Sequence, residues 1–223
     1  MNDRASLFDL QNVAVSYAKE PALHDITLKI HEGEKVALIG PSGAGKTTLL
    51  HKLYDLRPNE SAFVYQHYAL VSQLSTFHNT YIGRLDQNRT LYNLLNLIKP
   101  QKRILTEVSQ ILEVLGLSDN LHEKVGSLSG GQQQRVAISR ALYRKSQILL
   151  ADEPVSSIDP HQADKILKLI LESASTVVLS LHSVSLALQN VDRIVGLRKG
   201  RIFFDLPSAQ VTDSLLSDLY QAC

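Results

Sequence analysis

A glycine-rich loop between an apolar run and a helical run is the feature that most constrains the fold of this chain. The apolar run covers residues 36–39, and a run at helical spacing begins at Thr48. The loop fits the pattern G-x-x-x-x-G-K-[ST] with Gly40, Pro41, Ser42, Gly43, Ala44, Gly45, Lys46 and Thr47. A strand before this pattern and a helix after it are the context that a phosphate-binding loop requires. We therefore predict a phosphate loop rather than the alternative, a chance glycine-rich turn.

The residue types of this loop suit a nucleotide with a bound cation. Glycines leave backbone N–H groups free to face the α- and β-phosphates. Lys46 can reach the β- and γ-phosphates, and the Thr47 hydroxyl can ligate Mg²⁺. Thr48, which follows in the helix start, is a further candidate for nucleotide binding.

A second helix start, within residues 128–135, also has the features of an anion site. Ser129 precedes two consecutive glycines, Gly130 and Gly131, and a polar run that begins at Gln132. Without Cβ atoms in the way, backbone N–H groups can approach a phosphate, and the helix N-terminus adds partial positive charge. Two phosphate-binding helix starts in one chain indicate a protein that grips a nucleotide from two sides.

Two carboxylates directly follow the apolar run at residues 148–151, namely Asp152 and Glu153. The carboxyl end of a parallel strand is where such a sheet presents ligand-binding groups. Neighbouring side chains on a strand point opposite ways, so the two can divide the work. We expect Asp152 to hold Mg²⁺, directly or through water, and Glu153 to orient or deprotonate the attacking water. An acidic pair alone is more often a solvated turn, but the phosphate loop favours the catalytic interpretation.

Three further residues are candidates for the site only because of where they stand relative to the predicted strands. His182 follows the apolar run 176–181, so we expect it near the γ-phosphate, although a lone histidine is more often an ordinary hydrogen-bonded residue. Gln66 follows the run 62–65 and could contact Mg²⁺ or the water; by itself it would carry no signal. Tyr17 offers a flat face on which adenine could stack, although an aromatic at a strand end is usually just packing.

The apolar runs at residues 36–39, 62–65, 148–151 and 176–181 predict a mostly parallel sheet with both faces covered. Residues 7–17 and 22–30 alternate apolar and polar side chains, which favours two half-buried antiparallel strands, with a break at Glu20 and Pro21. Near the end, residues 193–197 and 201–204 flank Lys199 and Gly200 and predict a β-hairpin.

A helical insertion separates the second and third apolar runs. Thr90 is expected to cap one helix that carries Leu91, Leu94, Leu95 and Ile98 and ends before Pro100. Another helix follows with Ile104, Val108, Ile111 and Leu115, up to Gly116. The basic residues Lys99, Lys102 and Arg103 are interpreted as a solvated helix junction. We expect one domain over residues 1–223, with a helical lobe at about residues 67–145.

Composition excludes several classes of protein. The chain has 223 residues, 44% hydrophobic and 20% charged, which suits one globular domain, and its net charge of +1 gives no drive toward nucleic acid. Cys223 is the only cysteine, so neither a disulfide framework nor a cysteine metal site is expected, and a reducing cytoplasmic setting fits best. No apolar run approaches the ~18 residues needed to cross a bilayer, and no signal peptide is visible. If the protein serves a membrane, another chain must span it.

In this order, the motifs resemble the nucleotide-binding subunit of ABC transporters, and the resemblance covers essentially the whole chain. The matching positions are Tyr17, the phosphate loop, Gln66, residues 128–135, 148–153 and 156–159, and His182. Residues 181–188 and 192–202 are most similar to ATPases of phosphonate importers. The resemblance implies an α/β fold: a P-loop NTPase core with a mostly parallel sheet, an antiparallel β layer and an inserted α-helical lobe.

The resemblance also implies the working assembly. ATP with Mg²⁺ would lie between the phosphate loop of one subunit and the Ser129, Gly130 and Gly131 turn of a second, in a homodimer. Asp159 would contact the opposite subunit, and His182 would act as a switch at the γ-phosphate. The helical lobe and the segment after Gln66 would receive an integral-membrane permease on the cytoplasmic face of the membrane. A substrate-binding protein would be an indirect partner, and hydrolysis would reopen the dimer.

One departure from the family pattern concerns the stretch before Gln66. Members usually carry additional antiparallel strands there, whereas only residues 55–63 remain, so the antiparallel layer should be trimmed. Within residues 156–159, Ser157 and Ile158 stand where alanine and leucine are more usual. Since every residue expected to act in hydrolysis is present, we expect an active enzyme without a C-terminal regulatory domain.

Other functions are weighed against transport. A soluble ABC protein would normally show two cassettes, a long coiled coil or a basic surface. A regulator that binds nucleotide without hydrolysing it would have lost Glu153 or the Ser129 turn. A transporter ATPase for another cargo remains open, because the cargo contacts the permease and the binding protein rather than this chain.

Overall fold

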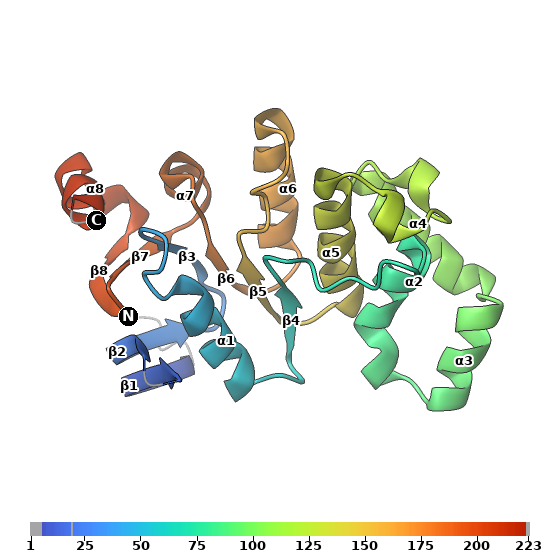
Figure 1. Cartoon of the computed structure of the whole chain (residues 1–223), viewed down its shortest axis with the longest axis horizontal. Helices are drawn as coiled ribbons and strands as arrows, with labels where there is room; N and C mark the ends of the chain where they lie inside the picture. The colour runs from blue at the N-terminus through green and yellow to red at the C-terminus, as the bar shows by residue number, and fades with distance from the viewer. Residues whose placement is uncertain (1–5, 19, 222–223) are drawn as a thin grey trace.

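Six strands form the main sheet of the computed structural model: β3 (Lys35–Ile39), β4 (Ser61–Val64), β5 (Ile148–Asp152), β6 (Thr176–Ser180), β7 (Arg193–Arg198) and β8 (Arg201–Pro207). Their order across the sheet is β4-β5-β6-β3-β7-β8 (Figure 1). All pairs are parallel except β7 with β8, which form the antiparallel hairpin expected from the sequence. The structure describes residues 6–18 and 20–221, so Cys223 lies outside it.

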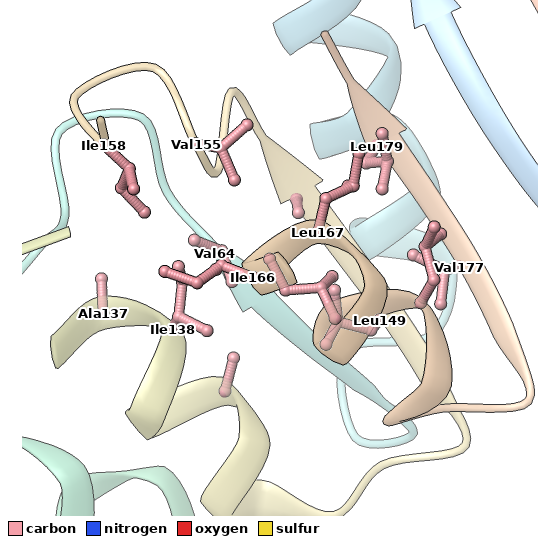
Figure 2. Packing of buried hydrophobic residues seen from close by; sticks show 14 of the residues in the cluster. Val64, Ala137, Ile138, Leu149, Val155, Ile158, Ile166, Leu167, Val177 and Leu179 are labelled. Carbon is pink, nitrogen blue, oxygen red and sulfur yellow. The ribbon is translucent and has the colours of Figure 1, made fainter. Parts of the chain in front are cut away.

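Both faces of this sheet are buried, as the continuous apolar runs predicted. Along β3, Val36 and Leu38 belong to one hydrophobic cluster and Ala37 and Ile39 to the other. The first cluster includes residues of α1 (Lys46–Leu56), and the second includes residues of α5 (Gly130–Arg144) and α6 (Pro160–Glu172). Figure 2 shows side chains of α5 and α6 meeting those of β4, β5 and β6. The parallel sheet therefore presents only its edges and strand ends to a ligand.

A separate two-stranded antiparallel sheet, β1 (Ser6–Tyr17) with β2 (Glu20–His31), confirms the trimmed layer. Residues 57–60, between α1 and β4, form only a turn, in which the Glu60 N–H donates to the Arg57 carbonyl. The expected break at Glu20 and Pro21 is wrong, because both residues lie inside β2. Pro21 is tolerated there since it pairs with Ser16 beside the hairpin connection of a two-stranded sheet, where a missing N–H costs little.

The helical insertion lies between β4 and β5 and extends away from the strands (Figure 1). It comprises α2 (Thr76–Tyr81), α3 (Thr90–Ile98), α4 (Lys102–Val114), α5 and the 3₁₀ turns Ile82–Gln87, Ser118–Asn120 and Val125–Ser127. The remaining helices are α7 (Val184–Asn190), α8 (Asp213–Tyr220) and the 3₁₀ turn Ser208–Gln210. Among the described residues, every helix is too short or too polar to cross a bilayer.

Helix α3 buries polar side chains and exposes apolar ones, which is the reverse of an ordinary surface helix. Its asparagines are buried: the Asn93 carboxamide accepts from the Tyr81 hydroxyl and donates to the Leu85 carbonyl, and Asn96 accepts from the Gln101 N–H. Four of its apolar side chains are between 53% and 77% exposed, namely Leu91, Leu94, Leu95 and Ile98, whereas Leu97 is half-buried against the core. The expectation that Thr90 caps this helix is wrong, because Arg89 holds the cap position without a side-chain bond and Thr90 is already helical.

Candidate active site

The phosphate loop connects β3 to α1, as the glycine pattern predicted. Gly40 has a φ of 145°, and a Cβ there would lie 2.1 Å from the Leu197 carbonyl oxygen of β7. Gly45 caps α1 in the left-handed region with a φ of 100°, and a Cβ there would lie 2.6 Å from Leu23 of β2. Both positions require glycine on conformational and steric grounds. The loop therefore fits closely against β7 and the antiparallel sheet.

The Lys46 ammonium folds back over this loop. Its Nζ donates to the Gly40 carbonyl at 2.7 Å and to the Pro41 carbonyl at 3.0 Å, and the residue is only 6% exposed. Burial lowers the pKa of Lys46 below its usual range, while the carboxylates of Glu153 and Asp152 oppose part of that shift. An ammonium in a ring of backbone groups and near two carboxylates is well placed to meet an anion that enters the loop.

Asp152 is a buried carboxylate whose two oxygens are bonded to hydroxyl groups. Thr47 Oγ1 donates to one oxygen at 2.7 Å, and Ser180 Oγ donates to the other at 2.6 Å. The carboxylate itself is 2% exposed and stands at the carboxyl end of β5. The oxygens of Thr47, Asp152 and the Gln66 amide form a hard donor set, which is the chemistry that Mg²⁺ prefers.

Glu153 lies just past β5 in the left-handed region, with a φ of 50°. Its carboxylate contacts His182 Nε2 at 2.6 Å and accepts from Gln66 Nε2 at 3.2 Å. Its backbone N–H donates to Ser180 Oγ at 2.9 Å. For a residue other than glycine this conformation costs about 1–3 kcal/mol, and it persists where surrounding contacts fix it. Glu153 is thus held by groups from the ends of β4 and β6, the two strands that flank β5.

The glycine turn predicted as a second anion site begins α5. Ser129 is the N-cap: its Oγ accepts from the Gln132 N–H at 3.3 Å, and its own N–H donates to Gln132 Oε1 at 2.9 Å. Gly130 is exposed, and its nearest contact for an added Cβ is the Tyr68 hydroxyl at 4.0 Å. This reciprocal capping leaves the Gly130 and Gly131 side of the helix start free of its own side chains.

Two other predicted residues lie apart from the carboxylates. Asp159 is the N-cap of α6, where its side chain accepts from the His161 N–H at 2.9 Å. Tyr17 is the last residue of β1 and is 58% exposed, on the hairpin that packs against the phosphate loop through Ala22 and Leu23. Ser42, Gly43 and Thr47 are exposed along the loop, and Thr48 is half-buried in α1.

The structure thus joins one set of predicted residues and leaves another separate. Hydrogen bonds or ion-pair contacts connect Thr47 to Asp152, and Gln66 and His182 to Glu153. The bonds of the glycine turn, by contrast, stay within the helical insertion: beyond its capping box, Gln132 reaches only Asn120, among the residues that the structure describes. The structure thus gathers the phosphate-loop candidates at one place and leaves the predicted glycine turn as a separate, exposed helix start.

Sequence reasoning missed two residues of the site. Ser180 bonds both the Asp152 carboxylate and the Glu153 N–H, and the available signal was a single hydroxyl at the end of an apolar strand. Gln134 donates to the Glu153 carbonyl at 2.8 Å, but it lies in a run of three glutamines that sequence alone does not distinguish.

Comparisons with known proteins agree with this geometry. A family model described as ABC transporter matches residues 23–156. The chain is 39% identical over 240 residues to a phosphonates import ATP-binding protein, PhnC, of Pseudomonas putida, which covers 95% of this chain and 88% of the relative. It is 34% identical to PhnC of Shigella sonnei, over 97% of this chain and 95% of that protein.

Solved structures resemble the whole fold. The dimeric structure of MJ0796, a bacterial ABC transporter cassette, matches with a TM-score of 0.77 and 28% identity, covering 90% of this chain and 98% of that one. A dimeric post-hydrolysis structure of the same cassette, bound to ADP and Pi, matches with a TM-score of 0.72 over the same shares.

Proposed function

Because this chain belongs to the ABC transporter family, we propose that it is the ATP-hydrolysing subunit of an importer for phosphonates or related oxyanions. The family membership inferred from the motifs is confirmed, and the chain is an ATPase of this family. The observation that carries the proposal is the convergence of Lys46, Thr47, Asp152 and Glu153 at one edge of the parallel sheet. This ATPase is one domain over residues 1–223, with its helical lobe at about residues 67–145.

In the proposed reaction, Glu153 accepts a proton from a water molecule as the water oxygen attacks the γ-phosphorus of ATP. The bond from that phosphorus to the bridging oxygen breaks, and ADP leaves with the electron pair. Lys46 and the backbone N–H groups of residues 42–48 hold the phosphates and offset their charge. Gln66 and His182 orient the Glu153 carboxylate through their contacts with it, and His182 also faces the γ-phosphate.

The oxygen donors present fit a divalent cation. Thr47 and Asp152, with Gln66, would hold Mg²⁺, which when bound neutralises charge on the β- and γ-phosphate oxygens. The Thr47 hydroxyl donates to Asp152, and Ser180 keeps the other carboxylate oxygen in place, so this donor set is arranged within the chain itself.

Two copies of the chain are proposed to share each ATP. The Ser129, Gly130, Gly131 and Gln132 turn supplies N–H groups at a helix start, yet it bonds only within its own insertion. A second copy that brings this turn to the phosphate loop would complete the site, with Asp159 contacting the partner and Tyr17 stacking on adenine. The dimeric cassette to which this chain is similar supports such an assembly.

The permease is proposed to dock on the outward face of α3. That helix has no charged residue and exposes Leu91, Leu94, Leu95 and Ile98 together, while its polar asparagines are buried. Scattered surface leucines are ordinary, but a contiguous apolar stripe of this kind marks an interaction site. Docking there would hold the protein at the cytoplasmic face of the membrane as a peripheral subunit, and the permease would link it to a substrate-binding protein.

Mutation of this face tests the permease contact. With Leu94→Asp and Ile98→Asp combined, co-purification with the integral-membrane partner should fall at least ~10-fold, because charges are placed in an apolar contact. ATP hydrolysis by the free protein should stay within ~2-fold, since the phosphate site is untouched. Gln110→Asp, on the exposed side of α4, is the control for added charge. Undiminished co-purification of the double variant would refute docking on α3 but leave the ATPase assignment intact.

Cargo is tested in cells. A strain that lacks this gene should lose uptake of labelled phosphonate, and the wild-type chain should restore it. Restored uptake of a different oxyanion alone would change the cargo and keep the transport role. Hydrolysis of ATP without any membrane partner would favour a soluble role instead.

A further inference from the structure

Gln134 of α5 directs its whole side-chain amide at the turn that follows β5. It is 1% exposed, and its Nε2 donates to the Glu153 carbonyl at 2.8 Å and to Ser156 Oγ at 3.2 Å. Its Oε1 accepts from the Ser157 N–H at 2.8 Å. A buried amide with this many partners is costly to disturb, because each lost partner leaves a polar group unpaired.

The backbone that Gln134 holds belongs to the strained residue Glu153. Ser180 binds the N–H of Glu153, and Gln134 binds its carbonyl, so the two peptide groups on either side of the left-handed φ are each fixed by a side chain. Ser180 comes from the end of β6, whereas Gln134 comes from the helical insertion. The direction of the Glu153 carboxylate therefore depends on two separate parts of the fold.

The same helix touches the same turn a second time, near its start. A Cβ on Gly131 would lie 2.8 Å from the Ser157 carbonyl oxygen, so α5 approaches the turn more closely than another residue would permit. Further along α5, Ala137 and Ile138 lie in the cluster with Val155 and Ile158, which flank the turn (Figure 2). A shift of α5 must therefore move the turn with it, since packed interiors yield little.

We propose that Gln134 is a positioning residue. It couples the position of the glycine turn of α5 to the orientation of the Glu153 carboxylate. The distance along the helix is short, since Ser129 is the N-cap of α5 and Gln134 lies in its first turns. When the glycine turn binds nucleotide, the position of α5 becomes fixed. The Gln134 amide then fixes the Glu153 backbone so that the carboxylate is oriented for proton transfer. This inference rests on the proposed role of Glu153 and adds a residue to it.

Gln134→Glu is the sharpest test, because it keeps an acceptor for the Ser157 N–H and removes both donated bonds. We expect kcat for ATP hydrolysis to fall about tenfold or more, since each lost buried hydrogen bond is of about that size. KM for ATP should stay close to that of the wild type, since the phosphate loop is unchanged. The melting temperature should fall, because a buried amide is replaced by a buried carboxyl. Gln134→Met, which removes all three bonds, should lower kcat at least as far and speed hydrogen exchange at the Ser157 amide.

Gln110→Glu is the control for the change of amide to carboxyl, since Gln110 is exposed on α4, outside both predicted phosphate sites. Its kcat should equal that of the wild type. Wild-type kcat in Gln134→Glu would overturn the proposal, and so would a fall in kcat/KM that comes from a higher KM alone. Failure of the proposed function itself would appear separately, as full activity in Glu153→Gln.

Discussion

The two predicted phosphate sites differ in how much of each the chain completes by itself. At the phosphate loop, Lys46 folds over two loop carbonyls, Thr47 bonds Asp152, and Glu153 is held by Gln66 and His182. At the glycine turn, Ser129 and Gln132 bond each other and Gln132 reaches Asn120 of the same insertion, and Gly130 is exposed. The first site combines a buried ammonium with two carboxylates, whereas the second consists only of a helix N-terminus.

This difference shows that a glycine-opened helix start is not in itself a site. Both starts carry free N–H groups and the partial positive charge of a helix terminus. Only the phosphate loop adds a buried cation and two carboxylates at the end of a parallel strand. The glycine turn makes sense as the part that a second copy needs, and the contact of α5 with the Glu153 turn explains how its occupancy could matter for hydrolysis.

The largest effect is expected at Glu153, because this carboxylate belongs to the phosphate-loop site and the glycine turn has no counterpart to it. Glu153→Gln should lower turnover by ~10²- to 10⁴-fold, because it removes the group that accepts the proton from water. ATP affinity, measured by calorimetry, should be retained, since the phosphate contacts survive. Glu172→Gln, an exposed carboxylate at the end of α6, serves as the control. Near-normal turnover in Glu153→Gln would sink the role of this carboxylate.

A smaller effect, on binding rather than turnover, is expected at Lys46. Lys46→Ala should weaken ATP affinity by about 10- to 100-fold, because one charge-assisted contact with the phosphates is lost. Calorimetry on the purified chain measures this, with Lys52→Ala of the same helix as the comparison. Unchanged affinity in Lys46→Ala would contradict the phosphate-loop assignment and remove the contrast between the two sites.

The smallest effect on nucleotide affinity of the single chain is expected at the glycine turn. Ser129→Arg should change that affinity less than ~2-fold, yet block the ATP-driven dimer, because a long side chain fills the surface that the second copy must meet. Sedimentation with ATP, in the non-hydrolysing Glu153→Gln background, measures dimer formation. Ser118→Arg, exposed elsewhere in the helical insertion, controls for the added charge. An intact ATP dimer in the Ser129 variant would refute the shared site.

Several elements could be predicted because their causes are local. The phosphate loop, the helix after Ser129 and the parallel strands follow from glycine spacing, capping residues and continuous apolar runs, which act over a few residues. The shortened stretch before Gln66 likewise predicted a trimmed antiparallel layer. Errors arose at boundaries: Thr90 is one residue inside its helix, and Pro21 lies within a strand, because local preferences are weak at the ends of elements.

The orientation of α3 shows a limit of pattern reading. Its leucines recur at helical spacing, which is typical of a stripe that faces a core. Asn93 and Asn96 instead find partners in the Tyr81 hydroxyl and in backbone groups of the insertion, and those partners lie on other segments. A pattern records which residues share a face, but the neighbours decide which face is buried.

The sequence by itself determined the motif order, the α/β class and the residue types that are proposed to hold phosphate, since each depends on neighbours along the chain. Only the tertiary structure decided that Ser180 joins Asp152 to Glu153, that Gln66 and His182 meet on one carboxylate, and that Gln134 grips its backbone. The physical reason is strand order: β4, β5 and β6 are far apart along the chain but adjacent in the sheet, so their ends meet at a single edge.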